Sequence, residues 1–259
     1  MPLSIEQIKS VEDTIRNSLR NRFNTYNPEP AVMPFHTRLL GKDRLALYSF
    51  IHSLNTNFGT TIFEPVAASL ASSRFKVVKL QMKSGSQISE KAQYEIQKIM
   101  DELTAANQKP DKNKEIEIIR KVCQKGEMRT VKPTRVDIYL ESEDDEIYLF
   151  DIKTAKPNKG GFKEFKRTLL EWTATVLSEN ANAKINTLIA IPYNPYEPKP
   201  YSRWTMAGML DLEEELKVAE EFWDFLGGKG AYVDLLGCFE RVGVEMRQEI
   251  DTYFARFNR

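Results

Sequence analysis

The sequence has few cysteines, no excess of charge of either sign and no long apolar run. Cys123 and Cys238 stand far apart in apolar surroundings, which fits neither a disulfide framework nor a zinc site. No apolar run approaches the roughly 20 residues that a membrane span needs, and charges at Glu6 and Lys9 argue against a signal peptide. We therefore expect a cytoplasmic protein with reduced thiols and no membrane partner.

The lack of net charge excludes a uniformly basic protein that coats nucleic acid without regard to sequence. The 259 residues hold 37 Lys and Arg against 37 Asp and Glu. The balance is uneven along the chain, with net charges of +5, −3, +4 and −6 over residues 1–100, 101–150, 151–203 and 204–259. The acidic last quarter argues against non-specific binding to a polyanion such as DNA over the whole surface. The two basic segments could still form a local binding site for one.

Signatures of several enzyme classes are also missing. The chain has no nucleophile-elbow, P-loop or G-x-G-x-x-G pattern, which argues against serine hydrolases and P-loop NTPases. Residues 227–230 are glycine-rich but follow a predicted helix, so a helix cap and turn are expected there. His36 and His52 have no Cys or His partner at metal-ligand spacing, and packing or surface roles are expected for both.

Helical periodicity dominates both ends of the chain. Apolar residues recur every three or four positions from Ile5 to Phe23, with Ser4 and Gln7 placed as a capping box. A helix that starts at Thr61 is expected after Gly59 ends its predecessor. The other predicted helices cover residues 44–58, 89–104, 114–124, 162–177, 211–226 and 239–257.

Strand patterns occupy the middle of the chain. Residues 134–154 alternate apolar and polar side chains around an acidic turn at 142–145, which predicts a β-hairpin. Residues 75–82 also predict a strand, and the apolar run 187–191 suits a strand buried on both faces. A helix between strands favours a mixed sheet with a crossover.

These patterns predict an α/β fold with a mixed central β-sheet flanked by helices and helical decorations at both chain ends. We expect a single domain with three parts: a helical N-terminal part over 1–60, a sheet core over 61–192, and a loop with C-terminal helices over 193–259.

Two acidic residues interrupt the apolar strands of the predicted hairpin. Residues two apart in a strand share a face, so Asp151 and Lys153 project together while Ile152 points to the opposite side. With a turn centred near Asp144, Asp137 lies opposite or diagonal to Asp151. Neighbouring carboxylates repel each other unless a cation lies between them, and Mg²⁺ suits that position.

Such a cluster has a chemical use. A bound metal polarises a phosphoryl oxygen and generates hydroxide from water, and a nearby ammonium such as that of Lys153 stabilises the added negative charge. The pattern therefore favours phosphodiester hydrolysis. The alternative is a surface ion pair between Asp151 and Lys153, against which stands the rarity of Asp within apolar strands.

Glu64 is a further acidic residue near the start of a predicted helix. Its spacing from Thr61 matches a capping box, in which the carboxylate reaches back to the Thr61 amide. The residues alone favour that interpretation over the alternative, in which Glu64 faces the hairpin and completes a metal site.

The acidic residues and Lys153 resemble the PD-(D/E)xK nuclease superfamily, although the proline is at Pro133 rather than beside the first Asp. Longer strings, from about residue 30 to the end, are similar to type II restriction endonucleases of the TdeIII-like group. They are Pro34-Phe-His-Thr-Arg-Leu-Leu40, Phe63-Glu-Pro-Val-Ala67, Pro192-Tyr-Asn-Pro-Tyr196 with Pro200-Tyr-Ser-Arg-Trp204, and Phe222-Trp-Asp-Phe-Leu-Gly-Gly228.

The resemblance implies a restriction-endonuclease-like fold and Mg²⁺-dependent cleavage of both strands of a short palindromic DNA site, GGNCC-like, with Mn²⁺ able to substitute. It implies a homodimer, each copy cutting one strand, in a restriction–modification system whose DNA methyltransferase protects host sites. By analogy, Asp137, Asp151 and the Ile152 carbonyl bind the metal. Lys153 orients the attacking water or stabilises the transition state, and Glu64 is an accessory acid.

The basic segments and a Pro-Tyr-rich loop contain the candidates for DNA contact. Arg and Lys read guanine N7 and O6 in the major groove, and tyrosines add donors and flat surface. The alternatives are solvated surface charges for the cations and packing for the tyrosines; Lys163 and Lys166 are expected on a solvated helix face. The candidates are Arg38, Lys156, Lys159, Tyr193, Asn194, Lys199, Tyr201 and Arg203.

The aromatic stripe Phe222, Trp223 and Phe225 is expected to be core, with a dimer contact as the alternative. For function, the alternatives to a restriction enzyme are a repair or recombination nuclease of the same superfamily, and a DNA-binding or helical interaction protein without catalysis.

Overall fold

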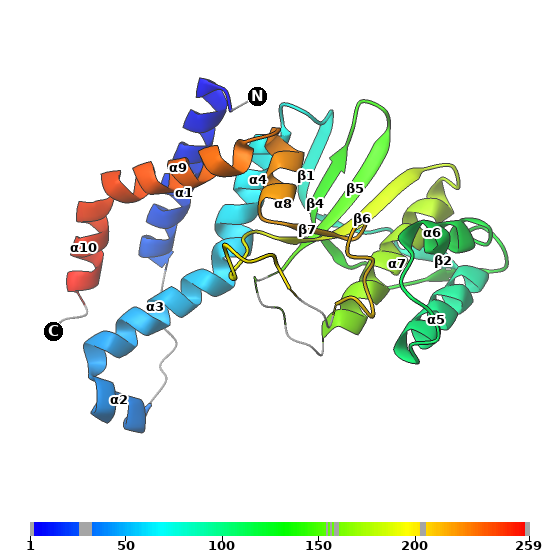
Figure 1. Cartoon of the computed structure of the whole chain (residues 1–259), viewed down its shortest axis with the longest axis horizontal. Coiled ribbons are helices and arrows are strands. Elements are labelled where there is room, and N and C mark those ends of the chain that lie inside the picture. The colour runs from blue at the N-terminus through cyan, green and yellow to red at the C-terminus, as the bar shows by residue number, and fades with distance from the viewer. Residues whose placement is uncertain are drawn as a thin grey trace.

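A five-stranded mixed sheet forms the centre of the protein (Figure 1). A computed structural model describes residues 3–25, 33–153, 155, 157, 161–202 and 206–256. The sheet order is β1 (Val77–Lys83), β4 (Arg135–Glu141), β5 (Glu146–Ile152), β6 (Lys184–Ile191) and β7 (Leu216–Val218). The first three strands pair antiparallel, and the last three pair parallel. The mixed sheet predicted from the sequence is thus confirmed.

Helices cover both faces of this sheet because its middle strands are apolar on both sides. Against one face, which presents Leu149 and Ile189, lie α5 (Glu90–Thr104), α6 (Lys112–Arg120) and α7 (Phe162–Glu179). Against the other, which presents Phe150 and Ala190, lie α1 (Ile5–Thr25), α4 (Glu64–Ala71), α8 (Glu220–Gly227) and α9 (Ala231–Glu245). Phe222, Trp223 and Phe225 pack in this second core, so their interpretation as core residues is confirmed.

Local signals in the sequence fix several element ends. The Ser4 amide donates to Gln7 Oε1 at 2.9 Å, and the Gln7 amide donates to Ser4 Oγ at 3.2 Å, which is the predicted capping box.

Cys123 and Cys238 are both buried and form no disulfide. His52 stacks on Tyr48, a packing role as expected. Within the described ranges, every helix is too short or too polar to span a lipid bilayer.

The helix expected to start afresh at Thr61 is instead part of one long rod. α3 (Lys42–Phe58) passes through a π turn, Gly59–Phe63, directly into α4. Gly59 has right-handed helical dihedrals, φ −51° and ψ −65°, so it does not end the helix. The prediction failed because glycine stops a helix only where it adopts another conformation, and the π turn widens the rod without breaking it.

The C-terminal helices also differ from the prediction. Residues 211–226 are not one helix, because Leu216–Val218 pair with β6 as strand β7 and α8 begins only at Glu220. The helix expected over 239–257 begins earlier, as α9, and a break at Met246 separates it from α10 (Arg247–Ala255). Two short sheet strands, β2 (Gln87–Ser89) and β3 (Met128–Thr130), were not predicted, since three residues carry no periodicity.

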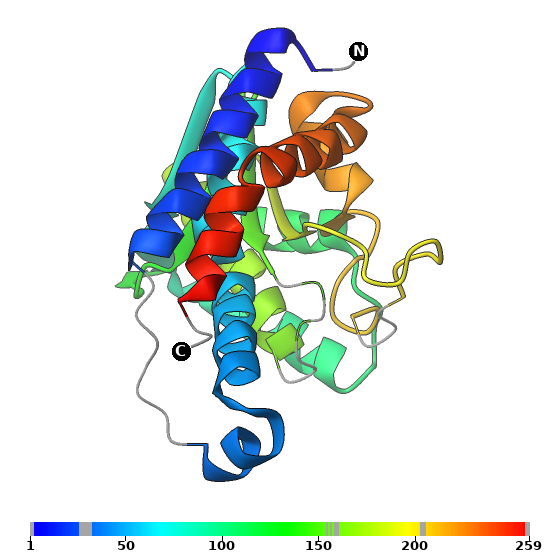
Figure 2. The same cartoon turned by 90° about the vertical axis from the view of Figure 1, so that its left-hand side faces the viewer.

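The acidic end of the chain packs against the basic N-terminal helix (Figure 2). Arg16 pairs with Glu245 at 2.7 Å and Arg20 with Glu249 at 2.6 Å, while Arg241 reaches back to Glu12. These pairs are partly exposed and contribute little energy each. They do account for part of the uneven charge, because two carboxylates of the −6 segment neutralise arginines of the +5 segment.

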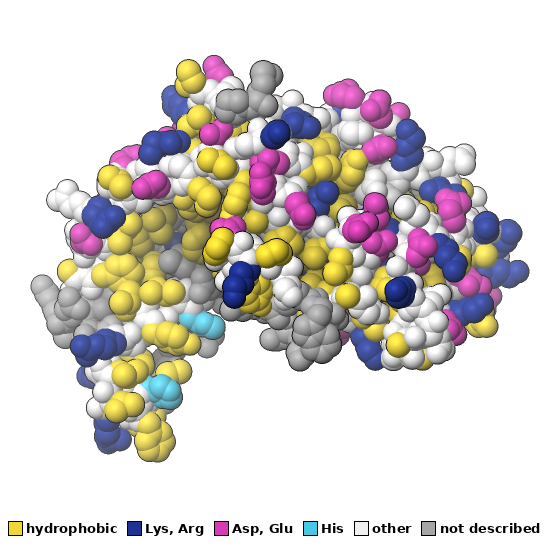
Figure 3. Space-filling view, viewed as in Figure 1, with side chains coloured by type: hydrophobic (Ala, Val, Ile, Leu, Met, Phe, Trp, Pro, Cys, Tyr) yellow, Lys and Arg dark blue, Asp and Glu magenta, His cyan; other side chains and the backbone are white. Residues whose placement is uncertain are grey.

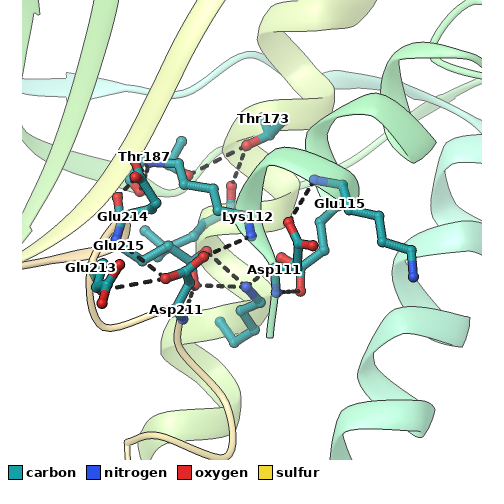
Figure 4. A network of polar contacts seen from close by, with 12 residues as sticks. Asp111, Lys112, Glu115, Thr173, Thr187, Asp211, Glu213, Glu214 and Glu215 are labelled. Atoms are coloured by element: carbon teal, nitrogen blue, oxygen red, sulfur yellow. Dashed lines mark hydrogen bonds and ion pairs between the residues drawn. The ribbon is translucent and has the colours of Figure 1, made fainter. Parts of the chain in front are cut away.

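A buried ionic cluster joins α6, α7 and the segment before β7. Lys166 is fully buried, and its Nζ donates to Glu215 Oε1 and Oε2 at 2.8 and 2.7 Å and pairs with Glu115. The expectation that Lys166 belongs to a solvated helix face is therefore wrong, whereas Lys163 is exposed. Nearby Lys112 donates to the carbonyls of Thr187 and Glu214 (Figure 4).

Lys166→Met should destabilise the fold by about 3–5 kcal/mol, because it leaves the Glu115 and Glu215 carboxylates buried without their cation. Urea unfolding measures the change. Lys163→Met, on the exposed side of the same helix, should stay within about 0.5 kcal/mol of the wild type. Equal unfolding curves for the two variants would contradict the role given to the buried cluster.

Candidate functional site

A cavity of about 1200 Å³ opens beside the end of the β4–β5 hairpin. One wall carries charged side chains from the hairpin and from the long helical rod. The rest of the lining is largely apolar and comes from the rod, the loop after β6, Trp223 and α9. The charged lining consists of Glu64, Arg135, Asp137, Asp151 and Lys153. Four of the residues assigned a catalytic role from the sequence thus line one cavity.

The hairpin register brings the two aspartates together. Ile138 pairs with Phe150, so Asp137 stands one step further toward the open end, level with Asp151, as predicted. Asp137 Oδ2 accepts a hydrogen bond of 2.8 Å from the Ile152 amide. This contact ties the first carboxylate to the backbone of the strand that carries the second.

Lys153 lies on the same side as Asp151, as the strand periodicity predicts. Its Nζ is 2.7 Å from Asp151 Oδ2 and 4.6 Å from the centre of the Phe165 ring on α7. The Lys153 amide donates to the Ala190 carbonyl of β6 at 2.9 Å. The parallel neighbour strand and the aromatic ring therefore hold the lysine in place, while its ammonium stays partly exposed to the cavity.

Asp151 is a strained carboxylate in electrostatic terms. The pKa of Asp151 is raised to about 6, mainly by burial, with Lys153 opposing the shift and the neighbouring Asp137 adding to it. Burial disfavours the charged form because the carboxylate loses its hydrating water, and the ion pair with Lys153 offsets only part of that loss. A divalent cation between the two aspartates would supply that charge.

Glu64 points toward the aspartates from the rod. It is almost fully buried, and its carboxylate accepts a hydrogen bond from the Gln81 side chain of β1. Burial raises the pKa of Glu64, and the bond from Gln81 opposes this shift. Residue 61 lies inside the continuous rod, so the helix-cap interpretation of Glu64 is wrong: α4 has no side-chain cap.

Gln81 is a site residue that the sequence did not indicate. By the β1–β4 register it stands opposite Asp137, between the pairs Leu80–Ile138 and Met82–Val136. Its φ is +57°, which is unusual for a non-glycine residue inside a strand and costs on the order of 1–3 kcal/mol. Strain of this kind concentrates at functional sites, but no sequence pattern predicts a positive φ at glutamine.

Arg135 is the second residue that the sequence reasoning missed. Its guanidinium lies 3.9 Å from Glu64 Oε1 and 3.8 Å from Asp137 Oδ1. A signal did exist, because Arg135 and Asp137 are two apart in one strand and so share a face. Arg135 thus places a positive charge in the cavity, close to both Glu64 and Asp137.

The donor set suits a hard divalent cation. Asp137 and Asp151 offer carboxylate oxygens at the mouth of one hairpin, and carboxylates are the ligands that Mg²⁺ prefers. Within the described ranges, no group of three or more His, Cys, Asp and Glu side chains is arranged to hold a metal ion. Two carboxylates supplemented by a backbone carbonyl and water match Mg²⁺, which keeps several waters of its own.

The candidate DNA contacts that the structure describes fall into three groups. Tyr193 is half exposed and lines the cavity, whereas Lys199 and Arg38 are exposed outside its lining. Asn194 and Tyr201 brace the loop, since Asn194 Nδ2 donates to the Lys199 carbonyl and the Tyr201 hydroxyl donates to the Ala155 carbonyl. Three further candidates lie outside the described residues: Lys156, Lys159 and Arg203.

Comparison with known proteins gives a consistent picture. The model of a type II restriction endonuclease family, HinfI, matches residues 3–243. The TdeIII-like group, which the sequence strings resemble, is not confirmed by these matches. Type II restriction endonucleases generally use divalent metal ions, in agreement with the carboxylate pair.

Individual restriction enzymes are similar over most of the chain. The type II restriction enzyme MjaII of Methanocaldococcus jannaschii is 28% identical over 261 aligned residues, covering 88% of this chain and 68% of that protein. The type II restriction enzymes HgiCII and HgiEI of Herpetosiphon aurantiacus are each 25% identical over 223 residues, covering 85% of this chain and 80% of theirs.

Asp151→Asn should make the metal-free protein more stable at neutral pH. Since the folded pKa of about 6 lies above the ordinary value near 3.9, the wild type loses stability as pH rises between these values. We expect the variant to be about 1–3 kcal/mol more stable than the wild type near pH 7.5, and this gain to vanish near pH 4. Urea unfolding in a chelator measures both, and a variant less stable than the wild type near pH 7.5 would refute the assigned strain.

Proposed function

The chain belongs to the HinfI family of type II restriction endonucleases, and we propose that Asp137, Asp151 and Lys153 form its catalytic centre for Mg²⁺-dependent cleavage of DNA. One observation carries this assignment: the hairpin places both carboxylates and the ammonium at one end of the sheet, beside a cavity. Restriction enzymes of this kind act on double-stranded DNA at specific sites. The expected target is a short palindrome, GGNCC-like by the resemblance noted above.

The aspartates are the proposed metal ligands. Asp137 is oriented by the Ile152 amide and Asp151 by Lys153, so both carboxylates are held before any metal arrives. The Ile152 carbonyl is the third proposed protein ligand. When bound, Mg²⁺ polarises a phosphoryl oxygen and lowers the pKa of a coordinated water.

Lys153 is the proposed electrostatic partner of the scissile phosphate. Its ammonium already lies against Asp151 and over the Phe165 ring, and it remains partly exposed toward the cavity. From this position it can hydrogen-bond the attacking water or stabilise the negative charge that develops on the phosphate.

Glu64 is the proposed accessory acid. Gln81 and Arg135 contact its carboxylate, and Asp137 is close enough to influence its pKa. Because Mg²⁺ retains several waters, a carboxylate at this position can bind the metal through water and orient that water for attack. Glu64 thus belongs to the proposed metal site without direct contact to either aspartate.

The proposed DNA contacts are the polar and basic residues that the sequence indicated. Tyr193 lines the cavity, from where it can touch DNA near the scissile phosphate, and Lys199 and Arg203 are proposed contacts from the same Pro-Tyr-rich loop. Asn194 and Tyr201 would act by holding this loop, and Arg38, Lys156 and Lys159 complete the proposed set. Cleavage of both strands calls for two copies of the chain, and host DNA would be protected by a companion methyltransferase.

Purified protein with plasmid DNA and Mg²⁺ tests the proposal. Discrete fragments that disappear with a chelator are expected. A smear would indicate a repair or general nuclease, and intact DNA a binding protein without catalysis. Asp151→Ala should abolish cutting without loss of the fold or of DNA binding, whereas Asp144→Ala, in the exposed turn of the same hairpin, should cut normally. A cutting Asp151→Ala variant would exclude the assigned centre.

Gln81→Gly should separate activity from stability. Glycine accepts the positive φ without strain, so the free energy of unfolding should change by less than about 1 kcal/mol. Loss of the bond to Glu64 should lower cleavage by about 10–100-fold, a range typical of residues that support metal ligands. It should also move the acid limb of the pH–rate profile upward, because that bond lowers the pKa of Glu64. A pH–rate profile that does not shift would contradict the role of Gln81 in setting the pKa of Glu64.

A further inference from the structure

Exposed apolar side chains lie along the arm that projects from the body of the protein, among basic residues (Figure 3). The arm consists of α2 (Pro34–Leu40) and the first part of α3, and it extends away from the sheet in Figure 1. Hydrophobic side chains gather on the projecting part in Figure 3. The arm patch consists of Met33, Phe35, Leu39, Leu40, Leu47, Tyr48 and Ile51, whose exposed fractions lie between 42% and 83%.

The patch is too large for an incidental surface feature. With about 180 Å² for a large side chain, its exposed fractions amount to an area on the order of 700 Å². The largest apolar patch of a typical monomer is about 300–600 Å², whereas a stable interface buries about 800 Å² on each partner. The arm patch alone therefore approaches what one side of a dimer needs.

The arm is anchored at a defined point. Phe50 is buried, and its ring lies 5.9 Å from Phe23, 5.0 Å from Tyr253 and 5.1 Å from Phe254. The exposed residues lie mostly N-terminal to this anchor. Because Phe50 is fixed among these aromatic rings, the arm is held in one direction. Its exposed apolar side chains therefore lie away from the body of the protein in a fixed arrangement.

We propose that the arm patch is the contact surface for a second copy of this chain. The described residues contain one Asp137–Asp151–Lys153 cluster, and a double-strand cut needs two; the inference rests on the proposed function for this requirement. A symmetric contact buries the same patch on both copies, which gives apolar surface an apolar partner.

The arm also connects directly with the catalytic cavity. The rod that begins at Lys42 reaches Glu64 after 22 residues, roughly 33 Å at the rise of an α-helix, and the π turn lies just before Glu64. π turns recur at functional sites. A partner that fixes the arm therefore fixes the base of the helix that carries the accessory acid.

Sedimentation of the 259-residue chain tests the arm patch as a dimer contact. Leu39→Glu and Phe35→Glu place charge at two of the most exposed patch positions, so neither should disturb folding. The wild type is expected as a dimer of the 29.9 kDa chain, and each variant should weaken self-association by at least about 100-fold. Tyr94→Glu, at a similarly exposed aromatic residue on α5, should leave the dimer intact.

Two results would overturn the proposal. One is a wild type that stays monomeric with and without DNA; the other is a Leu39→Glu variant that dimerises as well as the wild type. Plasmid cleavage supplies a second measurement, in which Leu39→Glu should accumulate nicked circles while Tyr94→Glu linearises DNA. If the wild type cuts no DNA, the proposed function fails, yet sedimentation still decides whether the arm patch is a dimer contact.

Discussion

The site depends on the proximity of two carboxylates that the protein itself neutralises only in part. The β4–β5 register sets Asp137 level with Asp151, and the Ile152 amide holds Asp137 there. Lys153 offsets the charge only in part, since the pKa of Asp151 remains raised to about 6. The folded chain thus carries an electrostatic cost at one end of its sheet, and a divalent cation is the simplest group that removes it.

The buried cluster around Lys166 balances its charges within the chain. Lys166 lies between Glu115 and Glu215 with no exposed surface, so the charges there are satisfied within the chain. Both clusters contain two acids and one lysine. They differ in that the cavity leaves Lys153 and the aspartates accessible, which suits a site that exchanges a metal and a phosphate rather than one that fixes helices.

The sequence predicted what depends on short-range periodicity and failed where tertiary packing decides. The hairpin, its register and the shared face of Asp151 and Lys153 follow from strand alternation and the acidic turn. The π turn before Glu64, the burial of Lys166 and the positive φ of Gln81 do not, since each depends on partners distant in the chain. Arg135 lay within reach of the same alternation rule that identified Asp137. The arm could not be foreseen, because its apolar spacing is that of an ordinary core-facing helix.

The central claim is that Asp137 and Asp151 together bind a divalent metal. Crystals of the protein grown or soaked with Mn²⁺ would test it through the anomalous difference density, which marks the metal without reference to activity. The account predicts a peak within coordinating distance of both carboxylates, on the cavity side of the hairpin. A well-occupied Mn²⁺ elsewhere, with no density between Asp137 and Asp151, would contradict it.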